Sequence, residues 1–354
     1  MSLPRILIAY NSPRREQNGR AIDYLSEVDV LHEVEAVRSA LVELGYECGM
    51  LPMQKSVGRF IDRAIRLAPD VVFNLVESWQ GESEYEMHFP CVFELIGVPY
   101  TGSPPLTLGT ANDKWTTKTL LRQARLPTPL GFICSEVPAR CHLGYPVIVK
   151  PMHEDASLGV DFESVVHNLT DLRRRVAWVL QNYHQPALVE EFVDGRELNV
   201  AVIGDQFQTA LPISEITFDQ MPQDLPRVVS YSAKWMPGSR GYNEMGAVCP
   251  APMSEELTLK VQNLAVEAFR LLGCRDYARI DFRLSMQGEP FILEVNPNPG
   301  IAPDAGLARS VAAAGRTYTQ FIGDVVSFAL QRGKRHDRAR IAARRPAVHR
   351  AAVA

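Results

Sequence analysis

The side chains best suited to chemistry lie in two stretches of the chain, YARIDFRL and FILEVN, with only the loop SMQGEP between them. A short connection that contains glycine predicts an antiparallel hairpin. If the loop is centred on Gln287–Gly288, Asp281 pairs with Glu294 and Arg279 pairs with Asn296. Successive side chains of a strand alternate between its two faces, so these four polar residues share one face of the hairpin.

The same register pairs apolar side chains on the opposite face of the hairpin. Ile280 is expected to face Val295, and Phe282 is expected to face Leu293. A slip of one residue would bring apolar side chains among the polar ones, so this register is favoured. Pro297 lies just past the last paired residue and cannot donate to a ladder, so the hairpin is expected to end there.

The carboxylates of Asp281 and Glu294 would repel each other unless a cation lay between them. Directly opposite side chains have Cβ atoms ~5 Å apart, and like charges in that position are destabilising. Carboxylate and amide oxygens are ligands that Mg²⁺ prefers, commonly together with substrate phosphates. The alternative is a solvated polar face balanced by Arg279, and the hairpin alone does not decide between the two.

Three lysines favour the metal-and-phosphate interpretation. Lys150 ends the apolar strand PVIVKP, Lys114 begins a helical pattern in NDKWTTK, and Lys234 lies in SAKW beside a stretch rich in glycine, proline and serine. One lysine at a strand end is usually a surface residue whose stem covers apolar neighbours. Three lysines with a carboxylate pair suit a polyphosphate, and the loop HEDASLG could fold over it through backbone N–H groups.

The elements that must position these residues follow an alternating order. PRILIAYN, ECGML and DVVFNLVE are expected strands with helical patterns between them, which predicts a parallel α/β sheet. Later strands are expected in LPTPLGFI, YPVIVKP, LVEEF and ELNVAVIG, and helices over 112–124 and 255–272. The expected units are a first domain at 1–105, a central lobe at 106–193, a C-terminal lobe at 194–332 and a tail at 333–354.

Composition and charge restrict the class of protein. The chain has 46% hydrophobic and 22% charged residues and a net charge of −4, as in ordinary soluble globular proteins. No apolar run approaches the ~20 residues of a membrane span, so no membrane partner is expected. The six cysteines are scattered without a CxxC motif, which favours a reducing compartment and therefore the cytoplasm.

The end of the chain is basic. Between 332 and 350 there are eight Lys or Arg residues and one acid, Asp337. Such a segment could bind nucleic acid. A solvated, disordered tail is the favoured interpretation, and nucleic acid is not expected as a partner.

Taken in order, several of these stretches resemble the D-alanine–D-alanine ligase family of the ATP-grasp superfamily. The resemblance rests on GVPYTGS, NDKWTTK, LPTP, YPVIVKP, LVEEFVDGRE, ARIDFRL, LEVNPNPG and SVAAAG, and it covers about 5 to 330. It implies a Rossmann-like parallel-sheet domain followed by a two-lobed ATP-grasp fold. It also implies a homodimer formed through the first domain.

The resemblance further implies an activity. Such ligases bind ATP and two Mg²⁺ ions, which Mn²⁺ can replace, and join small amino-acid-like substrates. A substrate carboxylate attacks the γ-phosphate, and an amine then displaces phosphate from the acyl phosphate to form an amide. By position, the resemblance places Lys114, Lys150 and Ser157 at the ATP phosphates, Glu190, Phe192 and Val193 at the adenine, Glu197 at the ribose, Lys234 at the γ-phosphate, Arg279 at the oxyanion, and Asp281, Glu294 and Asn296 at the metal.

The substrate side departs from the family pattern. Family members use a tyrosine, a serine, a glutamate and a Ser-Leu pair, and the matching positions here are Trp235, Ala156 beside Ser157, Val28 between Glu27 and Asp29, and Ala305–Gly306. A site without its dedicated hydrogen-bond partners discriminates its former substrate poorly. We therefore expect a different acid and amine, with Glu27, Asp29 and Glu82 as candidates for an ammonium group and Gly300, Ala305 and Gly306 beside the substrate.

Three functions remain to be weighed. The first is a ligase with altered amino-acid specificity, and the second is a true D-alanine–D-alanine ligase. The third is a nucleotide-binding regulatory protein without turnover. Retention of Lys150, Arg279, Asp281, Glu294 and Asn296 argues against the third.

Overall fold

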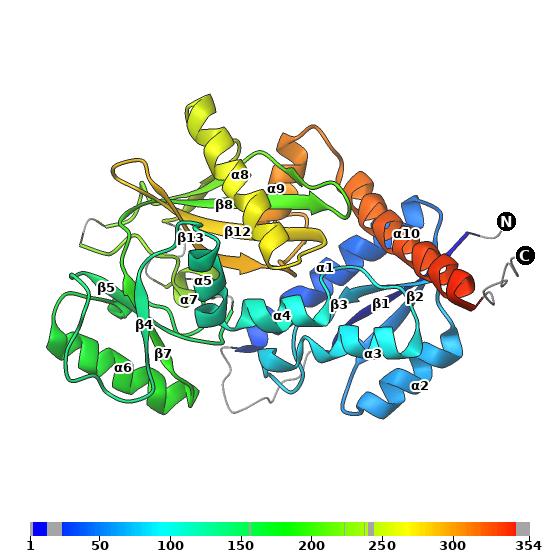
Figure 1. Ribbon diagram of the computed structural model, residues 1–354, viewed down its shortest axis with the longest axis horizontal. Helices are drawn as coiled ribbons and strands as arrows, with labels where there is room; N and C mark the ends of the chain where they lie inside the picture. The colour runs from blue at the N-terminus through cyan, green and yellow to red at the C-terminus, as the bar shows by residue number, and fades with distance from the viewer. Residues whose placement is uncertain are drawn as a thin grey trace, which may run out of the picture.

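Three β-sheets follow one another in a computed structural model of the chain (Figure 1). The described residues are 3–12, 23–155, 157–222, 224–236, 238–239 and 244–344. The side chains of 23–29, 234–235 and 336–344 are not among them.

The first domain is a parallel α/β unit, as the alternation of strands and helices predicted. Its strands run in the order β2-β1-β3, with both neighbours parallel. β1 is buried along most of its length because helices cover both faces of the sheet. The elements are β1 (Arg5–Asn11), α1 (Asp23–Glu43), β2 (Glu47–Met53), α2 (Val57–Leu67), β3 (Val71–Leu75), η1 (Ser83–Tyr85) and α3 (His88–Ile96).

The central lobe holds an antiparallel sheet with the strand order β4-β7-β5-β6. One face packs against α6, and apolar side chains of both fill the space between them. The elements are β4 (Gly131–Cys134), β5 (Val147–Pro151), η2 (Phe162–Ser164), β6 (Val165–Val166), α6 (Leu169–Tyr183) and β7 (Ala187–Glu191).

The helix expected over 112–124 is confirmed as α5 (Lys114–Gln123). A second short helix that was not expected, α4 (Pro105–Asn112), precedes it, and Asp113 between the two has an extended conformation. The Asp113 side chain accepts from the Thr116 N–H at 2.9 Å and caps α5. α5 packs against α8 (Glu255–Leu271) and β13 (Pro290–Asn296) of the C-terminal lobe. Its Lys118 also pairs with Glu190 of the central lobe, so α5 contacts both lobes.

The C-terminal lobe carries the largest sheet, in the order β11-β10-β8-β12-β13. The predicted hairpin forms its β12–β13 edge. The elements are β8 (Gly195–Gly204), β9 (Thr209–Ala210), β10 (Ser214–Thr217), α7 (Tyr231–Trp235), β11 (Gly246–Val248), α8 (Glu255–Leu271), β12 (Asp276–Ser285), β13 (Pro290–Asn296), α9 (Gly306–Ala313) and α10 (Tyr318–Arg344).

The two faces of this large sheet have different neighbours. Val200 and Ile280 point to the side that α8 covers. Ala201 and Tyr277 point to the other side, where they pack with α9, α10 and the first domain. Polar residues of β12 that share the face of Tyr277 therefore lie beyond this packed region, on the side toward the central lobe (Figure 1).

The hairpin register is confirmed at the polar end and wrong near the turn. Ile280 faces Val295 as expected, but Phe282 faces Ile292 because a bulge inserts Leu293 as an extra residue in β13. The bulge keeps the buried side chains of Phe282 and Ile292 in contact with the core while the polar end holds its own pairing.

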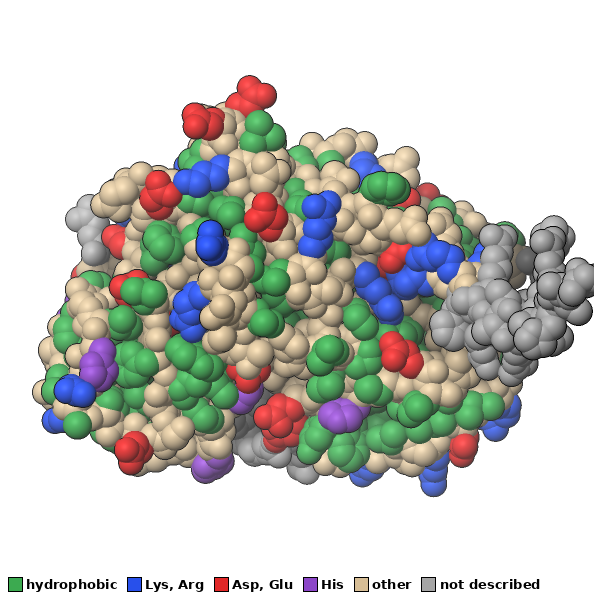
Figure 2. All heavy atoms as spheres, in the orientation of Figure 1, with side chains coloured by type: hydrophobic (Ala, Val, Ile, Leu, Met, Phe, Trp, Pro, Cys, Tyr) green, Lys and Arg blue, Asp and Glu red, His purple; other side chains and the backbone are tan. Residues whose placement is uncertain are grey.

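A disordered tail was expected from 333, but the structure continues as helix α10 past this position. α10 runs to Arg344, and within 333–354 the residues outside the described part of the chain are 345–354. Arg332 explains part of this order, since its Nη2 donates to Asp276 at 2.7 Å and to the Tyr100 carbonyl at 2.8 Å. Figure 2 shows Lys and Arg side chains gathered over α10.

Candidate active site

The predicted cluster of polar side chains forms at the end of the hairpin. Asp281 is paired with Glu294, and Arg279 is paired with Asn296. The Arg279 guanidinium donates twice to Asp281, at 2.7 Å to each carboxylate oxygen. The amide nitrogen of Asn296 donates to Asp281 at 3.0 Å and to Glu294 at 3.3 Å. The two carboxylates therefore converge on one point, as the alternation of side chains required.

The cluster extends onto a strand that sequence reasoning did not include. Asn199 on β8 lies opposite Asp281, and its amide nitrogen donates to Oδ1 of Asp281 at 2.7 Å. Ser214 on β10 lies opposite Asn199 in turn. The alternation in ELNVAVIG could have shown that Asn199 faces inward, but only the strand order places it beside Asp281.

The pKa values of the two carboxylates are shifted in opposite directions. Burial alone would raise the pKa of Glu294, but Lys114, Lys150 and Arg279 together lower it to about 2. Burial raises the pKa of Asp281 above its ordinary value, and the neighbouring charge of Glu294 adds to this, while Arg279 opposes it. The pair is therefore a site where an added cation would be stabilised.

These carboxylates also fit a divalent metal. Among the described residues no group of three or more His, Cys, Asp or Glu side chains is placed to hold a metal ion. Mg²⁺ needs fewer protein ligands, since it keeps several waters and takes oxygens from substrate phosphates. Asp281 and Glu294 supply two oxygens, and Asn296 would supply a third once its amide turned to present its oxygen between them.

Lys114 lies in the first turn of α5, behind the capping residue Asp113. Its ammonium donates to the carbonyl of Glu154 and lies 3.4 Å from the Asp155 carboxylate, so it contacts the loop that follows β5. The side chain is only 6% exposed. Lys114 thus contacts Glu154 and Asp155 of the loop after β5, and its charge helps to lower the pKa of Glu294.

Lys150 at the end of β5 shares a buried carboxylate with a second lysine. Its Nζ lies 2.7 Å from Glu190, and the Nζ of Lys118 lies 2.5 Å from the other oxygen of Glu190. Lys118 also donates to Thr128 at 3.0 Å. Burial lowers the pKa of Lys118 to about 8, although Glu190 opposes the shift. Lys118 was missed, and its place one turn after Lys114 in NDKWTTK was the available signal.

Glu190 therefore occupies a different environment from the adenine contact that was expected. Both of its oxygens face lysines, and the residue is 1% exposed. A carboxylate held this way positions Lys150, and an adenine contact remains a prediction.

Glu197 and the segment before it are linked by an arginine that was also missed. Arg283 on β12 lies 3.0 Å from Glu197 through Nη1 and donates through Nε to the Val193 carbonyl at 2.9 Å. Its guanidinium lies 5.6 Å from the centre of the Phe192 ring. Burial raises the pKa of Glu197, while Arg283 opposes the shift. The structure thus brings Phe192, Val193 and Glu197 together at the junction of the two lobes.

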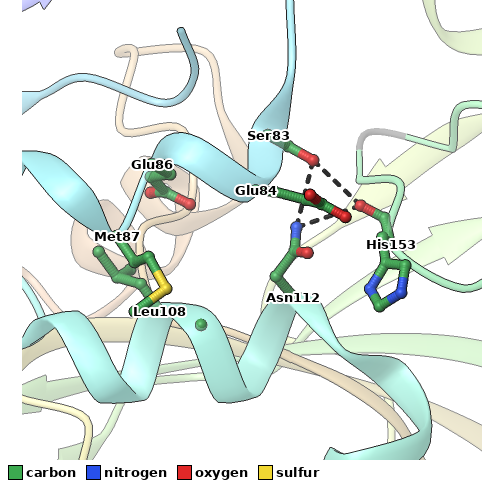
Figure 3. Close-up of a pocket in the computed structure, with 8 residues that line it drawn as sticks. Ser83, Glu84, Glu86, Met87, Leu108, Asn112 and His153 are labelled. Atoms are coloured by element: carbon green, nitrogen blue, oxygen red, sulfur yellow. Dashed lines mark hydrogen bonds between the residues drawn. The ribbon is translucent and has the colours of Figure 1, made fainter.

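A cavity of about 180 Å³ lies between η1, α4 and the loop after β5 (Figure 3). On one side, Ser83 donates to the His153 carbonyl at 3.0 Å, and Asn112 donates to both of them. On the other side lie Glu86 and Met87. These contacts join the first domain to the loop that Lys114 holds.

The first domain also reaches the segment that follows the hairpin. Asn298 in the sequence PNPG donates to Glu86 at 2.7 Å and accepts from the Tyr277 hydroxyl at 3.1 Å. Burial raises the pKa of Glu86 well above its ordinary value. The Ile301 N–H donates to Glu33 at 3.2 Å, and a Cβ on Gly300 would lie 3.8 Å from the same carboxylate. Gly300 therefore lies against α1.

For several of the remaining predicted site residues the structure describes the backbone but not the side chain. Glu27 and Asp29 lie on α1 and Lys234 and Trp235 on α7, but the described side chains do not include these four, and Ala156 lies outside the described residues. Glu82 is exposed at the N-cap of η1, outside the lining of the cavity. Ser157 has a positive φ of 64° in the loop after β5. Ala305 and Gly306 begin α9.

The described part of the chain contains no helix that combines the length and the apolar character needed to cross a bilayer.

Comparison with known proteins agrees with this architecture. The family model described as D-ala D-ala ligase C-terminus matches residues 131–327. An uncharacterized protein y4sG from Sinorhizobium fredii is 35% identical over 304 residues, which are 84% of this chain and 87% of that protein. A D-alanine–D-alanine ligase from Alcanivorax borkumensis is 33% identical over 243 residues, which are 69% of this chain and 73% of that enzyme.

The fold is shared with a solved structure. The crystal structure of D-alanine–D-alanine ligase from Bacillus anthracis complexed with ATP superposes with a TM-score of 0.72, covering 94% of this chain and 99% of that one at 20% sequence identity. The two-lobed fold expected from the motifs is therefore confirmed.

Proposed function

Because this chain belongs to the D-alanine–D-alanine ligase-like family of ATP-grasp enzymes, we propose that it joins an acid and an amine that differ from two D-alanine molecules. The chain is an ATP-dependent ligase of the acid–amino-acid type. The proposal concerns its substrates, its metal and the roles of its residues.

One observation carries the assignment of the chemistry to this site. The Asp281–Glu294 pair at the end of the hairpin lies within the electrostatic influence of Lys114 and Lys150, so a buried and a half-buried carboxylate share one region with two buried lysines. A polyphosphate with a divalent cation complements both signs of charge at once.

The proposed mechanism uses positioning and charge neutralisation. Lys114 and Lys150 bind phosphate oxygens of ATP, and Glu190 holds Lys150 in place. Asp281, Glu294 and Asn296 would hold a divalent ion, which would supply positive charge next to the transferring phosphoryl group. The substrate carboxylate attacks the γ-phosphorus and ADP leaves. The amine then attacks the acyl carbon, phosphate leaves, and the amine loses its proton.

Arg279 would act in the second step. Its guanidinium is oriented by two hydrogen bonds to Asp281, which fix its plane beside the metal ligands. A preorganised donor next to a developing oxyanion lowers the barrier without reorganisation at the moment of reaction.

The altered substrate is proposed from the residues at the substrate side. Trp235 stands where the family has tyrosine, and Ala305–Gly306 stand where it has a Ser-Leu pair that holds the carboxylate of the second D-alanine. Loss of those hydroxyl groups removes hydrogen bonds on which discrimination would depend. The amino-acid specificity therefore differs from that of the family members with these groups.

An ADP-release screen tests the proposal. Purified protein is incubated with Mg²⁺-ATP and D- and L-amino acids, singly and in all pairs, and products are identified by mass spectrometry. We expect ADP and an amide product with a pair other than D-alanine with itself. Rapid D-alanyl-D-alanine formation would instead identify a true D-alanine–D-alanine ligase. Nucleotide binding without ADP release for any pair would favour a regulatory protein.

Assembly and location are part of the proposal. Leu95 on α3 and Leu106 on α4 are 86% and 77% exposed, and Figure 2 shows hydrophobic side chains gathered in this part of the first domain. We propose a homodimer that covers them, which size-exclusion chromatography with light scattering would detect. The six cysteines are free, which suits a cytoplasmic enzyme.

A further inference from the structure

Thr128 lies between α5 and the first strand of the central lobe, β4, and a proline stands on each side of it. The residue is buried. Its hydroxyl accepts a hydrogen bond from the ammonium of Lys118 at 3.0 Å and donates to the Ile292 carbonyl at 2.8 Å. One hydroxyl at the entrance to the central lobe therefore joins a buried lysine of α5 to strand β13 of the C-terminal lobe.

The segment around Thr128 covers the open side of β13. Among the described strands of the large sheet, β13 is the last in order and pairs with β12. The Ile292 N–H donates to the Pro127 carbonyl at 2.8 Å, so both backbone groups of Ile292 have partners outside the sheet. Buried backbone groups at a sheet edge need such partners. Glu294 lies just beyond Ile292 and the bulge at Leu293, so these two bonds fix the part of β13 from which Glu294 extends.

The contacts of Lys118 continue in the other direction to Lys150 in the central lobe. The Nζ of Lys118 lies 2.5 Å from one oxygen of Glu190, and the Nζ of Lys150 lies 2.7 Å from the other. Lys118 is fully buried and Glu190 is 1% exposed, so solvent screens these contacts weakly. Five residues thus form a continuous path from β5 to β13, the interlobe path: Lys150, Glu190, Lys118, Thr128 and Ile292.

Both ends of the interlobe path lie at the proposed nucleotide site. Lys150 is proposed to bind phosphate, and Glu294, next to the other end of the path, is proposed to hold the metal. The charge of Lys150 also helps to lower the pKa of Glu294, so the two groups interact. A phosphate tail with its divalent ion can contact both groups only when the two lobes hold them at a matching separation.

From these contacts we infer that Lys118 and Thr128 are positioning residues that set the place of Lys150 relative to the metal-binding end of β13. Lys118 acts by holding Glu190, and Thr128 acts by holding Lys118 and Ile292 together. Neither residue touches the nucleotide itself. The inference rests on the proposed function of the site and adds two residues that decide how tightly the phosphates are bound.

Thr117 provides a matched control for Thr128. It is a buried threonine of α5 whose hydroxyl donates to the Thr110 carbonyl at 2.8 Å, so Thr117→Val removes a bond of the same kind outside the interlobe path. Calorimetric titration with Mg²⁺ and adenylyl imidodiphosphate, a non-hydrolysable ATP analogue, gives Kd for wild-type protein, Thr128→Val, Thr128→Ser and Thr117→Val. The melting temperature shows which variants are folded. Thr128→Cys, whose thiol is a weak hydrogen-bonding group, replaces the valine variant if that variant does not fold.

We expect Thr128→Val to raise Kd about 10-fold, a size typical of coupling within one network, while Thr128→Ser and Thr117→Val stay within about twofold of wild type. In Lys150→Met protein, adding Thr128→Val should change Kd by less than about twofold, because the residue through which Thr128 acts is gone.

Two results would overturn the inference. One is an equal Kd for Thr128→Val and Thr117→Val, and the other is a loss of affinity from Thr128→Val that is as large in Lys150→Met protein as in wild type. Wild-type protein that binds no analogue would overturn the proposed nucleotide site and this inference with it. Binding of the analogue without ADP release in the amino-acid screen would overturn the ligase proposal alone.

Discussion

The ammonium of Lys150 lies 2.7 Å from one oxygen of Glu190, while Lys118 lies 2.5 Å from the other. One buried carboxylate therefore balances two buried ammonium groups. Lys150 remains 11% exposed and is the member of the trio that can reach a ligand, whereas Lys118 is fully buried. Glu190 thus contributes to the stability of the central lobe and also positions Lys150, which is proposed to bind phosphate.

Glu190→Gln is expected to destabilise the protein by about 3–5 kcal/mol, because it leaves two buried lysines without a counter-charge. Unfolding in urea, followed by fluorescence, gives the free energy of unfolding. Glu163→Gln changes an exposed glutamate of η2 in the same way and should cost less than about 0.5 kcal/mol. Equal free energies of unfolding for the two variants would contradict the claim that Glu190 balances the buried charges of Lys118 and Lys150.

Lys118 predicts a pH dependence of stability. Its pKa is about 8 in the folded protein and 10.5 as its ordinary value, so the unfolded chain binds more protons between these values. Stability from this group therefore rises with pH across that window. Between pH 7.5 and 9.5 the wild-type protein should gain about 2 kcal/mol relative to Lys118→Met. A constant difference in the free energy of unfolding at both pH values would show that Lys118 has an unshifted pKa.

Arg332 should be important for the attachment of α10. It pairs with Asp276, which is fully buried at the start of β12, and with the Tyr100 carbonyl of the first domain. Arg332→Met would leave the Asp276 charge unpaired and should cost about 3–5 kcal/mol. Arg335→Met removes a more exposed ion pair to Asp205 and should cost less than about 1 kcal/mol. Urea unfolding of both variants measures the two losses of stability and shows whether Arg332→Met costs more than Arg335→Met.

The proposed metal site predicts a selective loss of turnover. Asp281→Asn and Glu294→Gln each remove one carboxylate from the pair, and kcat should fall on the order of 10²–10³-fold. Each change also takes a counter-charge away from Arg279 or from the two lysines, so the free energy of unfolding should fall, and kcat is compared at a temperature at which every variant is folded. Asp304→Asn, at a carboxylate 82% exposed, is the matched control. Calorimetric titration with Mg²⁺ and a non-hydrolysable ATP analogue should lose its magnesium dependence in the first two variants only.

Sequence periodicity was sufficient for the hairpin because its constraints are local. The alternation in YARIDFRL and FILEVN and the short loop between them placed Asp281 opposite Glu294, as the structure has them. The bulge at Leu293 was not predictable, since an extra residue leaves the polar end of the pattern unchanged. The short helix α4 (Pro105–Asn112) was missed because its eight residues, PLTLGTAN, show no clear apolar periodicity.

Local pattern was enough to predict the alternation of faces in the hairpin and the parallel first domain, because each depends on neighbours within a few positions. Three contacts became visible only in the folded chain: Asn199 lies beside Asp281, Lys118 and Lys150 share Glu190, and Arg283 joins Glu197 to Val193. Those contacts depend on strand order and on the packing of one lobe against another. Both are set by burial of apolar faces over the whole chain, which no short stretch of sequence encodes.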